Sequence, residues 1–242
     1  SQVMNLGGEI HSQSRWLNGA TVVMQDSALI EQVVSLPFVK WVQYTGKKST
    51  VSNVPKQPSK FSPAIDYGLS GSQIAQVKGN FLHELGYFGK NIVVGVLDAG
   101  FLNVDVNVAF DSLRLHNRLL GTKDFVGGSD LYRGNFHGGN VLSIMAGNLP
   151  QNYLGTAPDA SYWLIRTEDV DTEYLKELDF WVAGIEFADS VGSDVVNSSL
   201  GYFTFDDSAM NFTYADMNGE VSRAAKAASM AAQKGMIVVC SA

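Results

Sequence analysis

The sequence predicts an α/β protein built on a parallel β-sheet with helices on both faces. Short continuous apolar runs, typical of strands buried on both faces, occur at residues 92–97, 160–165, 194–197 and 236–240. Between these runs lie stretches with helical spacing of apolar residues. Alternation of strand and helix along the chain favours parallel strands joined by helical crossovers.

Composition excludes several classes of protein. The 242 residues are 45% hydrophobic and 17% charged, which is enough apolar material for a core and too little charge for a disordered chain. The formal net charge of −7 argues against a nucleic-acid partner. No apolar run approaches the roughly 20 residues that a membrane-spanning helix needs. The single cysteine, Cys240, excludes an intramolecular disulfide and any multi-cysteine metal site.

The amino-terminal part of the chain predicts a small strand–helix–strand unit. Residues 20–24 are β-rich, residues 27–34 have helical spacing with Ser27 as N-cap, and residues 38–44 alternate like a half-buried strand. Such a unit is too small to be stable alone, so we expect it to pack against a larger neighbour.

A polar segment after this unit predicts the main domain boundary. From residue 46 onwards Lys, Ser and Pro dominate and no apolar periodicity persists, which is typical of an exposed linker open to proteolysis. We therefore divide the chain into residues 1–45, a linker at 46–66 and a larger domain at 67–242.

Two long helices are predicted in the larger domain. Residues 172–191 place one apolar stripe on a helix, formed by Leu175, Leu178, Val182, Ile185 and Ala188. Residues 220–234 are rich in alanine at helical spacing, and Gly235 stands where a C′ residue ends a helix.

The carboxyl ends of parallel strands are where sites form in open α/β sheets. Asp98 directly follows the first apolar run, and His137 precedes a glycine pair and an apolar run, residues 141–147, that reads as a buried helix. Together they fit an orienting carboxylate and a general base. Taken singly, the aspartate could cap loop amides and the histidine could be structural. His11, His83 and His116 have no such context, and we interpret them as structural.

Several well-known motifs are missing from the sequence. It contains no Gly-x-Ser-x-Gly nucleophile elbow and no His-Glu-x-x-His zinc motif. A nucleotide-binding parallel-sheet protein remains an alternative, but the glycine-rich phosphate turn that it needs does not follow the first strand.

Five segments, in this order, resemble the subtilisin-like serine proteases (subtilases), especially the secreted subtilases of Bacteroidetes-type bacteria. They are residues 94–100, 137–147, 154–160, 197–201 and 235–242. Residues 10–44 are similar to the carboxyl-terminal half of a subtilase propeptide, with the usual first strand and helix missing upstream of Gly7. The resemblance implies a subtilisin-like parallel sheet, incomplete in this chain, preceded by part of an α+β propeptide domain.

The resemblance also implies roles for individual residues. Asp98 would hold His137 in the correct tautomer, and His137 would act as the general base. The strand that pairs with extended substrate would be formed by Ser199, Leu200 and Gly201, and Ser241 would lie near the first specificity pocket. The implied activity is that of a secreted serine endopeptidase, with a peptide or protein substrate and its own propeptide in the cleft. We expect a secreted, extracellular or cell-surface protein, and we recognise no signal-peptide pattern within the sequence. Calcium is common in the family, but no acidic cluster in the sequence supports a metal site, so we expect no cofactor.

Two departures from the family pattern matter. Gly139 stands where the family commonly has threonine. The oxyanion asparagine would fall shortly beyond Ala242, and the Gly-Thr-Ser segment with the nucleophile is not in the sequence. We therefore expect a truncated chain that is inactive alone and needs a carboxyl-terminal fragment carrying the serine. The alternative is a non-catalytic protein that uses the subtilase scaffold for binding or self-association.

Overall fold

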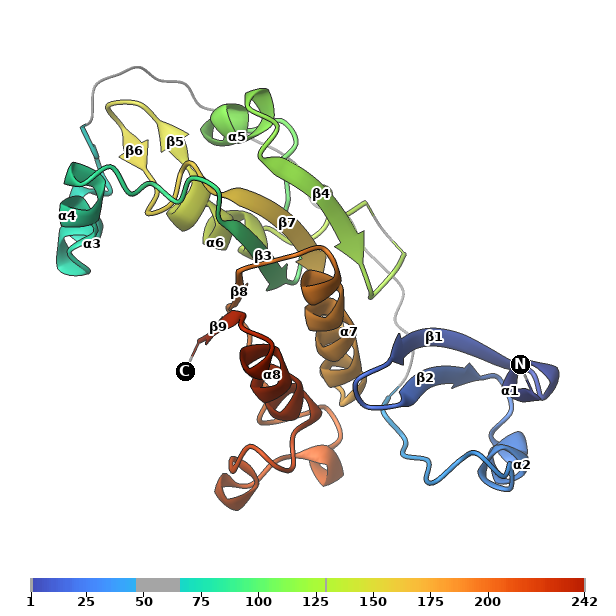
Figure 1. The fold of residues 1–242 in the computed structure, drawn as a ribbon. Coiled ribbons are helices and arrows are strands. Elements are labelled where there is room, and N and C mark those ends of the chain that lie inside the picture. Colours follow the sequence, from blue (N-terminus) through green and yellow to red (C-terminus); the bar gives the residue numbers. More distant parts are fainter. Residues whose placement is uncertain (1, 47–65, 129, 242) are drawn as a thin grey trace.

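The structure, a computed structural model, describes residues 2–46, 66–128 and 130–241. At its centre is a five-stranded sheet in the order β4-β7-β3-β8-β9 (Figure 1). Every pair of neighbouring strands in it is parallel. The strands are β3 (Val93–Asp98), β4 (Leu119–Asp124), β7 (Ser161–Arg166), β8 (Val195–Ser198) and β9 (Ile237–Cys240). The predicted α/β class with a parallel sheet is confirmed.

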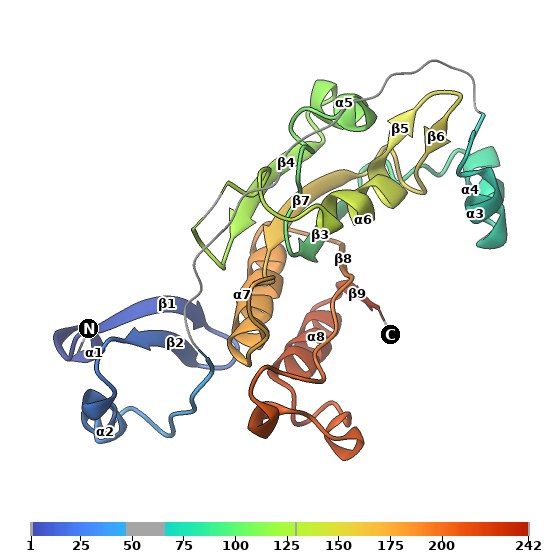
Figure 2. The same ribbon diagram turned by 180° about the vertical axis from the view of Figure 1, so that it is seen from behind.

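Helices cover both faces of this sheet. Helix α6 (His137–Ala146) lies on one face, and α7 (Lys176–Ser190) and α8 (Arg223–Gln233) lie on the other (Figures 1 and 2). Successive residues of a strand point to opposite faces. Accordingly Val96 of β3 packs in the cluster that contains α6, whereas the adjacent Leu97 packs with residues of α7 and α8.

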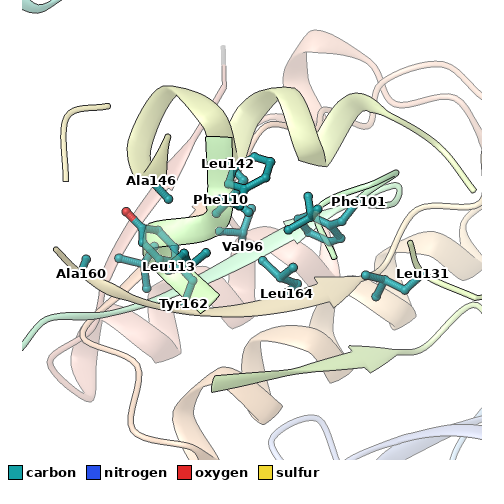
Figure 3. Packing of buried hydrophobic residues seen from close by; sticks show 12 residues of the cluster. Val96, Phe101, Phe110, Leu113, Leu131, Leu142, Ala146, Ala160, Tyr162 and Leu164 are labelled. Atoms are coloured by element: carbon teal, nitrogen blue, oxygen red, sulfur yellow. The ribbon is translucent and has the colours of Figure 1, made fainter. Parts of the chain in front are cut away.

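The α6 face carries most of the short elements. The 3-10 turn η2 (Val108–Phe110) and helix α5 (Asp111–Leu115) bring Phe110 and Leu113 into the same buried cluster as Leu142 (Figure 3). A second group of short elements lies near the carboxyl-terminal end of α6 (Figure 1). It consists of α3 (Gly71–Gln76), α4 (Gly79–Glu84), β5 (Asn148–Leu149) and β6 (Tyr153–Leu154).

The amino-terminal part forms a separate small unit beside α7. It contains α1 (Gln2–Asn5), an antiparallel hairpin of β1 (Gly8–Ser14) and β2 (Gly19–Met24), the 3-10 turn η1 (Ser27–Leu29) and α2 (Ile30–Val34). Both views place the hairpin beside α7 (Figures 1 and 2). There the ring of His11 lies 4.9 Å from that of Phe180. The expected packing of this unit against a larger neighbour is therefore observed at this contact.

Two predictions for this unit are wrong. Residues 38–44 form no strand, because no strand in the described part of the chain pairs with them, and Phe38 and Trp41 are each 62% exposed. The N-cap is Asp26 rather than Ser27, since the Asp26 side chain accepts a hydrogen bond from the Ala28 amide. Most of the predicted linker, residues 47–65, lies outside the described residues.

The larger domain follows the predicted pattern more closely. The helices predicted over 172–191 and 220–234 begin a few residues later, at Lys176 and Arg223. Gly235 has the left-handed φ of +101° expected after a helix. All five residues of the predicted stripe are buried: Leu175, Leu178, Val182, Ile185 and Ala188. The loop between β8 and α8 contains two turns, η3 (Ser208–Met210) and η4 (Tyr214–Asp216). Among the described residues, no helix has the length and apolar character needed to cross a bilayer.

Candidate active site

The structure brings together the two residues that sequence reasoning singled out. Asp98 is the last residue of β3, and His137 is the first residue of α6. Nδ1 of His137 lies 2.8 Å from Oδ1 of Asp98. The aspartate side chain is fully buried, while 48% of the histidine side chain is exposed. The imidazole is therefore accessible to solvent, while the carboxylate that binds it is fixed in the core.

Local structure makes this approach of α6 to β3 possible. A β-carbon on Gly138 would lie 2.5 Å from the carbonyl oxygen of Gly100 and 2.8 Å from Cβ of Asp98. Only glycine permits the first turn of α6 to sit so close to the strand end. The helix start is held by Asn135, whose Oδ1 accepts a hydrogen bond of 2.7 Å from the His137 amide.

The electrostatics of the pair fix its tautomer. Burial raises the pKa of Asp98, and the hydrogen bonds from His137 and from the Ala99 amide (2.7 Å) oppose that rise. An ionised carboxylate only accepts hydrogen bonds, so Nδ1 of His137 carries the proton. Nε2 has no partner among the described residues and is left with a free lone pair. A general base requires this arrangement.

The strands on either side of β3 leave room for an extended peptide. Beyond Asp98 the chain turns away, and the Phe101 amide donates to the Leu131 carbonyl oxygen. The flanking strands β7 and β8 continue into residues 167–175 and 199–203. Neighbouring strands are about 4.8 Å apart, so where the two continuations begin, on either side of Asp98, they are separated by roughly 10 Å. Farther along, the two chain segments approach each other, and the Asp206 amide donates to the Glu173 carbonyl oxygen. We call the space beside Asp98 the slot and the two continuations its rims; two strand spacings suit one extended chain.

The four predicted substrate-binding residues gather at one rim of the slot. Ser199, Leu200 and Gly201 follow β8, and Oγ of Ser199 accepts a hydrogen bond from the Asn197 side chain. Ser241 follows the neighbouring β9, where its amide donates to the Ser198 carbonyl oxygen at 3.0 Å. The hydroxyl of Ser241 donates to the Leu200 carbonyl oxygen at 3.2 Å. These residues therefore lie at the same sheet edge as Asp98.

A carboxyl cluster at the other rim was missed by sequence reasoning. One oxygen each from Glu168, Glu173 and Glu177 lies within 4.8 Å of the others. Glu177 is fully buried and accepts hydrogen bonds from the amides of Tyr174 (3.0 Å) and Asp169 (3.4 Å). The burial of a glutamate on a helix is not readable from the sequence, because its neighbours come from an irregular loop.

A proton shared by Glu168 and Glu177 allows these carboxyl groups to lie close together. Burial, followed by the negative charge of the neighbouring carboxylates, raises the pKa of Glu177 to about 10 and that of Glu168 to about 7. Glu177 is thus a neutral acid at neutral pH and makes a side-chain hydrogen bond to Glu168. Calcium prefers about six to eight oxygen ligands, most of them accessible carboxylates or carbonyls. A buried, protonated glutamic acid does not fit such a site.

Two carboxylates of α7 hold the amino-terminal hairpin: Asp179 accepts a hydrogen bond of 2.9 Å from the Thr21 hydroxyl, and Glu186 binds the turn after β1. Glu186 accepts hydrogen bonds from the amides of Arg15 (2.9 Å) and Trp16 (3.2 Å) and from the Ser14 hydroxyl. All three donors belong to the end of β1 and the turn that follows it. The side chain of a single helix residue therefore caps the turn of the hairpin.

The segment that follows this unit reaches the amino-terminal end of α7. The Lys176 amide donates to the Thr45 carbonyl oxygen at 2.7 Å. Arg223 donates to the Gln43 side chain at 3.0 Å and also pairs with Asp179 at 2.9 Å. Residues 43–46 consequently lie against the rim that carries the carboxyl cluster.

A parallel α/β sheet with a buried aspartate bound to a half-exposed histidine at its carboxyl edge fits the hydrolase class of α/β protein, and comparison with known families is more specific. Residues 89–242 match the model of the subtilase family, and residues 1–61 match that of the peptidase S8 propeptide domain of Bacteroidota. The first match covers more than half of the chain. The chain therefore belongs to the subtilase family of subtilisin-like serine proteases.

Individual relatives agree with this assignment. The chain is 27% identical to subtilisin E of Bacillus subtilis over 198 residues, which are 81% of this chain and 45% of that protein. It is 30% identical to subtilisin of Bacillus pumilus over 141 residues, 57% of this chain and 46% of that protein. The chain thus spans about half the length of these relatives.

Solved structures share the fold. The epidermin leader peptide processing serine protease of Staphylococcus aureus aligns with a TM-score of 0.62 at 18% identity, covering 99% of this chain and 56% of that one. MycP1 of Mycobacterium smegmatis aligns with a TM-score of 0.51 at 15% identity, covering 82% of this chain and 50% of that one. At such identities the similarity shows the subtilisin-like fold.

Proposed function

We propose that this chain is the amino-terminal part of a subtilisin-like serine endopeptidase. Residues 1–45 would be part of its propeptide, residues 46–66 a linker, and residues 67–242 the amino-terminal portion of the catalytic domain. The observation that carries the proposal is the 2.8 Å contact between Asp98 and the half-exposed imidazole of His137. The serine nucleophile and the oxyanion donor would come from the remainder of the longer protein, so residues 1–242 alone would be inactive.

The geometry of the pair suits peptide-bond hydrolysis. Nε2 of His137 would take the proton from the serine hydroxyl as the serine oxygen attacks the scissile carbonyl carbon. It would then give that proton to the departing amine as the C–N bond breaks, leaving an acyl-enzyme. A water molecule, deprotonated by the same nitrogen, would release the acid and restore the serine. Asp98 would stabilise the imidazolium cation that forms in each half of the reaction.

The slot supplies a way to hold the substrate. An extended peptide between the rims would pair its backbone with residues 199–201, as in strand addition to a sheet. Ser241 would contribute to the pocket for the side chain next to the cleaved bond. Protein or peptide substrates are expected, since only a chain in extended conformation can use both rims.

The amino-terminal unit would inhibit the enzyme until it is removed. Support comes from the Glu186 contacts with the hairpin and from the contact of Thr45 with the amide that begins α7. These contacts place residues 43–46 beside the rim that carries the carboxyl cluster, and we infer that the propeptide occupies the slot. A protease made with such a segment is suited to export before activation, and we infer that it is secreted.

Labelling with a fluorophosphonate, which reacts with activated serines, tests this function. The full-length protein, freed of its propeptide, should be labelled, and His137→Ala should abolish labelling. Residues 1–242 alone should not react, whereas mixing them with a carboxyl-terminal fragment that carries the serine should restore labelling. If the processed full-length protein stays unlabelled, the non-catalytic binding scaffold is the better explanation.

A further inference from the structure

The two rims of the slot are connected to each other by side chains. The hydroxyl of Tyr202, on the rim after β8, donates a hydrogen bond of 2.9 Å to Oε2 of Glu168, on the rim after β7. The other partner of Glu168 is the Glu177 carboxyl. Glu177 belongs to α7 and is fixed by the amides of Tyr174 and Asp169. One chain of hydrogen bonds thus runs from the substrate-pairing rim to a buried helix residue.

A second connection lies farther from Asp98 and joins the rim after β7 to Asp206, in the loop that follows the rim after β8. The Glu173 amide donates to the Asp206 carboxylate at 3.2 Å, and the Asp206 amide donates to the Glu173 carbonyl oxygen at 2.9 Å. Beside it the ring of Phe205 is buried against Leu175 and Leu178. This outer connection uses the Asp206 carboxylate, backbone groups and apolar packing, whereas the Tyr202–Glu168 contact joins the two sides by a hydrogen bond between two side chains.

Negative charge around the Tyr202–Glu168 contact makes it depend on the proton shared by Glu168 and Glu177. Glu168 lies near Tyr202, Glu177 and Glu173, and the charge of Asp98 also raises its pKa. Two cations of the adjoining chain segments pair with other carboxylates: Lys176 pairs with Asp169 at 2.6 Å, and Arg166 lies 3.5 Å from Asp124. Without the shared proton, Glu168 and Glu177 would repel each other as two anions, the first partly and the second fully buried.

We propose that the chain Tyr202–Glu168–Glu177 sets the separation of the two rims and thereby the fit of an extended peptide beside His137. This inference rests on the proposed peptidase function. Tyr202 and Glu168 act as positioning residues, because they act through the rims rather than on the scissile bond. A shift of Tyr202 would also displace residues 199–201, because they directly precede it in the chain. Loss of the contact therefore weakens binding of long peptides and leaves the chemistry at His137 intact.

Kinetics of the processed full-length enzyme test the proposal. Tyr202→Phe removes only the hydroxyl, and Tyr214→Phe is the matched control because Tyr214 is 91% exposed. For a peptide that fills the slot, Tyr202→Phe should raise KM about tenfold, the effect of losing a hydrogen bond to a charged group, with kcat within about twofold. For a short ester that does not span the rims, neither variant should change KM. An equal loss of kcat on both substrates would overturn the proposal.

The pH dependence supplies an independent readout. KM of the wild type should rise with pH as the pair loses its shared proton, because the rims then separate. In Glu177→Gln the amide keeps donating to Glu168 at every pH, so the part of the KM rise above neutrality that follows loss of the Glu177 proton should be absent. A wild-type KM that does not rise above neutrality would contradict the assignment.

Hydrogen exchange of residues 1–242 separates this proposal from the peptidase function. Tyr202→Phe should speed exchange of the amides in residues 168–174 and 199–206 about tenfold, whereas Tyr214→Phe should not. This measurement needs no catalytic serine. Unchanged exchange would contradict the role of the Tyr202–Glu168–Glu177 chain even if the enzyme is active. Faster exchange in a protein that fluorophosphonate does not label would support that role and contradict the peptidase function.

Discussion

Gly138 lies directly against the side chain of Asp98: a β-carbon at this glycine would be 2.8 Å from Cβ and 2.9 Å from Cγ of the aspartate. The contact joins the first turn of α6 to the end of β3, so the position of His137 depends on a missing side chain. The neighbouring Gly139 is different, because its β-carbon would meet nothing closer than the Leu102 carbonyl oxygen at 3.4 Å.

This difference predicts opposite effects of two alanine substitutions. Gly138→Ala should push α6 away from β3 and lower the free energy of unfolding by about 1–3 kcal/mol, as overpacking does. Gly139→Ala adds the same methyl group in a helix with space for it and should be neutral or stabilising by up to about 1 kcal/mol. Urea unfolding of residues 1–242 measures both. Equal effects of the two substitutions would show that the approach of α6 is not limited by Gly138.

Replacing Asp98 with asparagine should remove catalysis while preserving the fold. The amide of asparagine can donate to Nδ1, which favours the wrong tautomer of His137 and leaves the imidazolium without its counter-charge. We expect kcat of the processed full-length enzyme to fall about 10⁴-fold. Asp111→Asn, at an exposed carboxylate, is the control. A fall of less than about tenfold would mean that Asp98 does not serve His137 in this way.

The Glu186 contact predicts how tightly the amino-terminal hairpin is held. Glu186→Gln replaces one accepting oxygen with a donor that faces backbone amides, so at least one hydrogen bond to residues 14–16 is lost. Each such bond to a charged group contributes about 1.5–3 kcal/mol. Amide exchange in β1 and β2 should therefore accelerate more than about tenfold, with the rest of the sheet unaffected. The exposed Glu220→Gln should leave exchange unchanged, and a uniform acceleration in both domains would contradict the interpretation.

The carboxyl pair predicts a stability that falls as pH rises. The folded state raises the pKa of both Glu168 and Glu177 above 4.5, so it holds their protons more tightly than the unfolded chain does. The stabilisation is complete below about pH 4.5, and it is lost through about 7 for Glu168 and about 10 for Glu177. The slope should not exceed about 1.4 kcal/mol per pH unit per proton.

Urea titrations at pH 5, 7 and 9 measure this slope. Glu177→Gln cannot ionise and should flatten the part of the curve above neutrality, whereas Glu220→Gln should retain the wild-type slope. Stability that increases over this range in the wild type would show that the pair is not protonated in the folded state.

The sheet and the candidate catalytic pair could be predicted because their signals are local. Residues 92–97 and 160–165 are continuous apolar runs that need no partner to be recognised as strands. Asp98 and His137 then follow from the rule that parallel strands end at one edge. Their actual contact, over 39 positions of sequence, depends on the glycine after the histidine.

Other elements depend on tertiary partners that no local pattern reveals. Strand β1 reads as polar, yet Ser12 is buried and His11 packs on α7. Strand β4 contains Gly121, which reads as a turn; a β-carbon there would lie 2.4 Å from the Trp163 ring, so the glycine serves that close contact. Residues 38–44 have the right alternation for a strand but lack a ladder partner in the described residues.

The carboxyl cluster was unpredictable for a different reason. Glu168 and Glu177 are ordinary surface residues by composition, and only the irregular path of residues 167–175 buries them together. A shared proton, rather than a motif, is what makes the cluster stable.

Strand β9 is an edge strand of the sheet, which affects the solubility of residues 1–242. Ile237 and Val239 are 62% and 49% exposed, and no described strand pairs with its far side. An edge strand with unpaired backbone groups and exposed aliphatic side chains can pair with the same strand of a second copy of the chain. Preparations of residues 1–242 are therefore expected to oligomerise as protein concentration increases, and a lysine in place of Val239 should keep them monodisperse in light scattering.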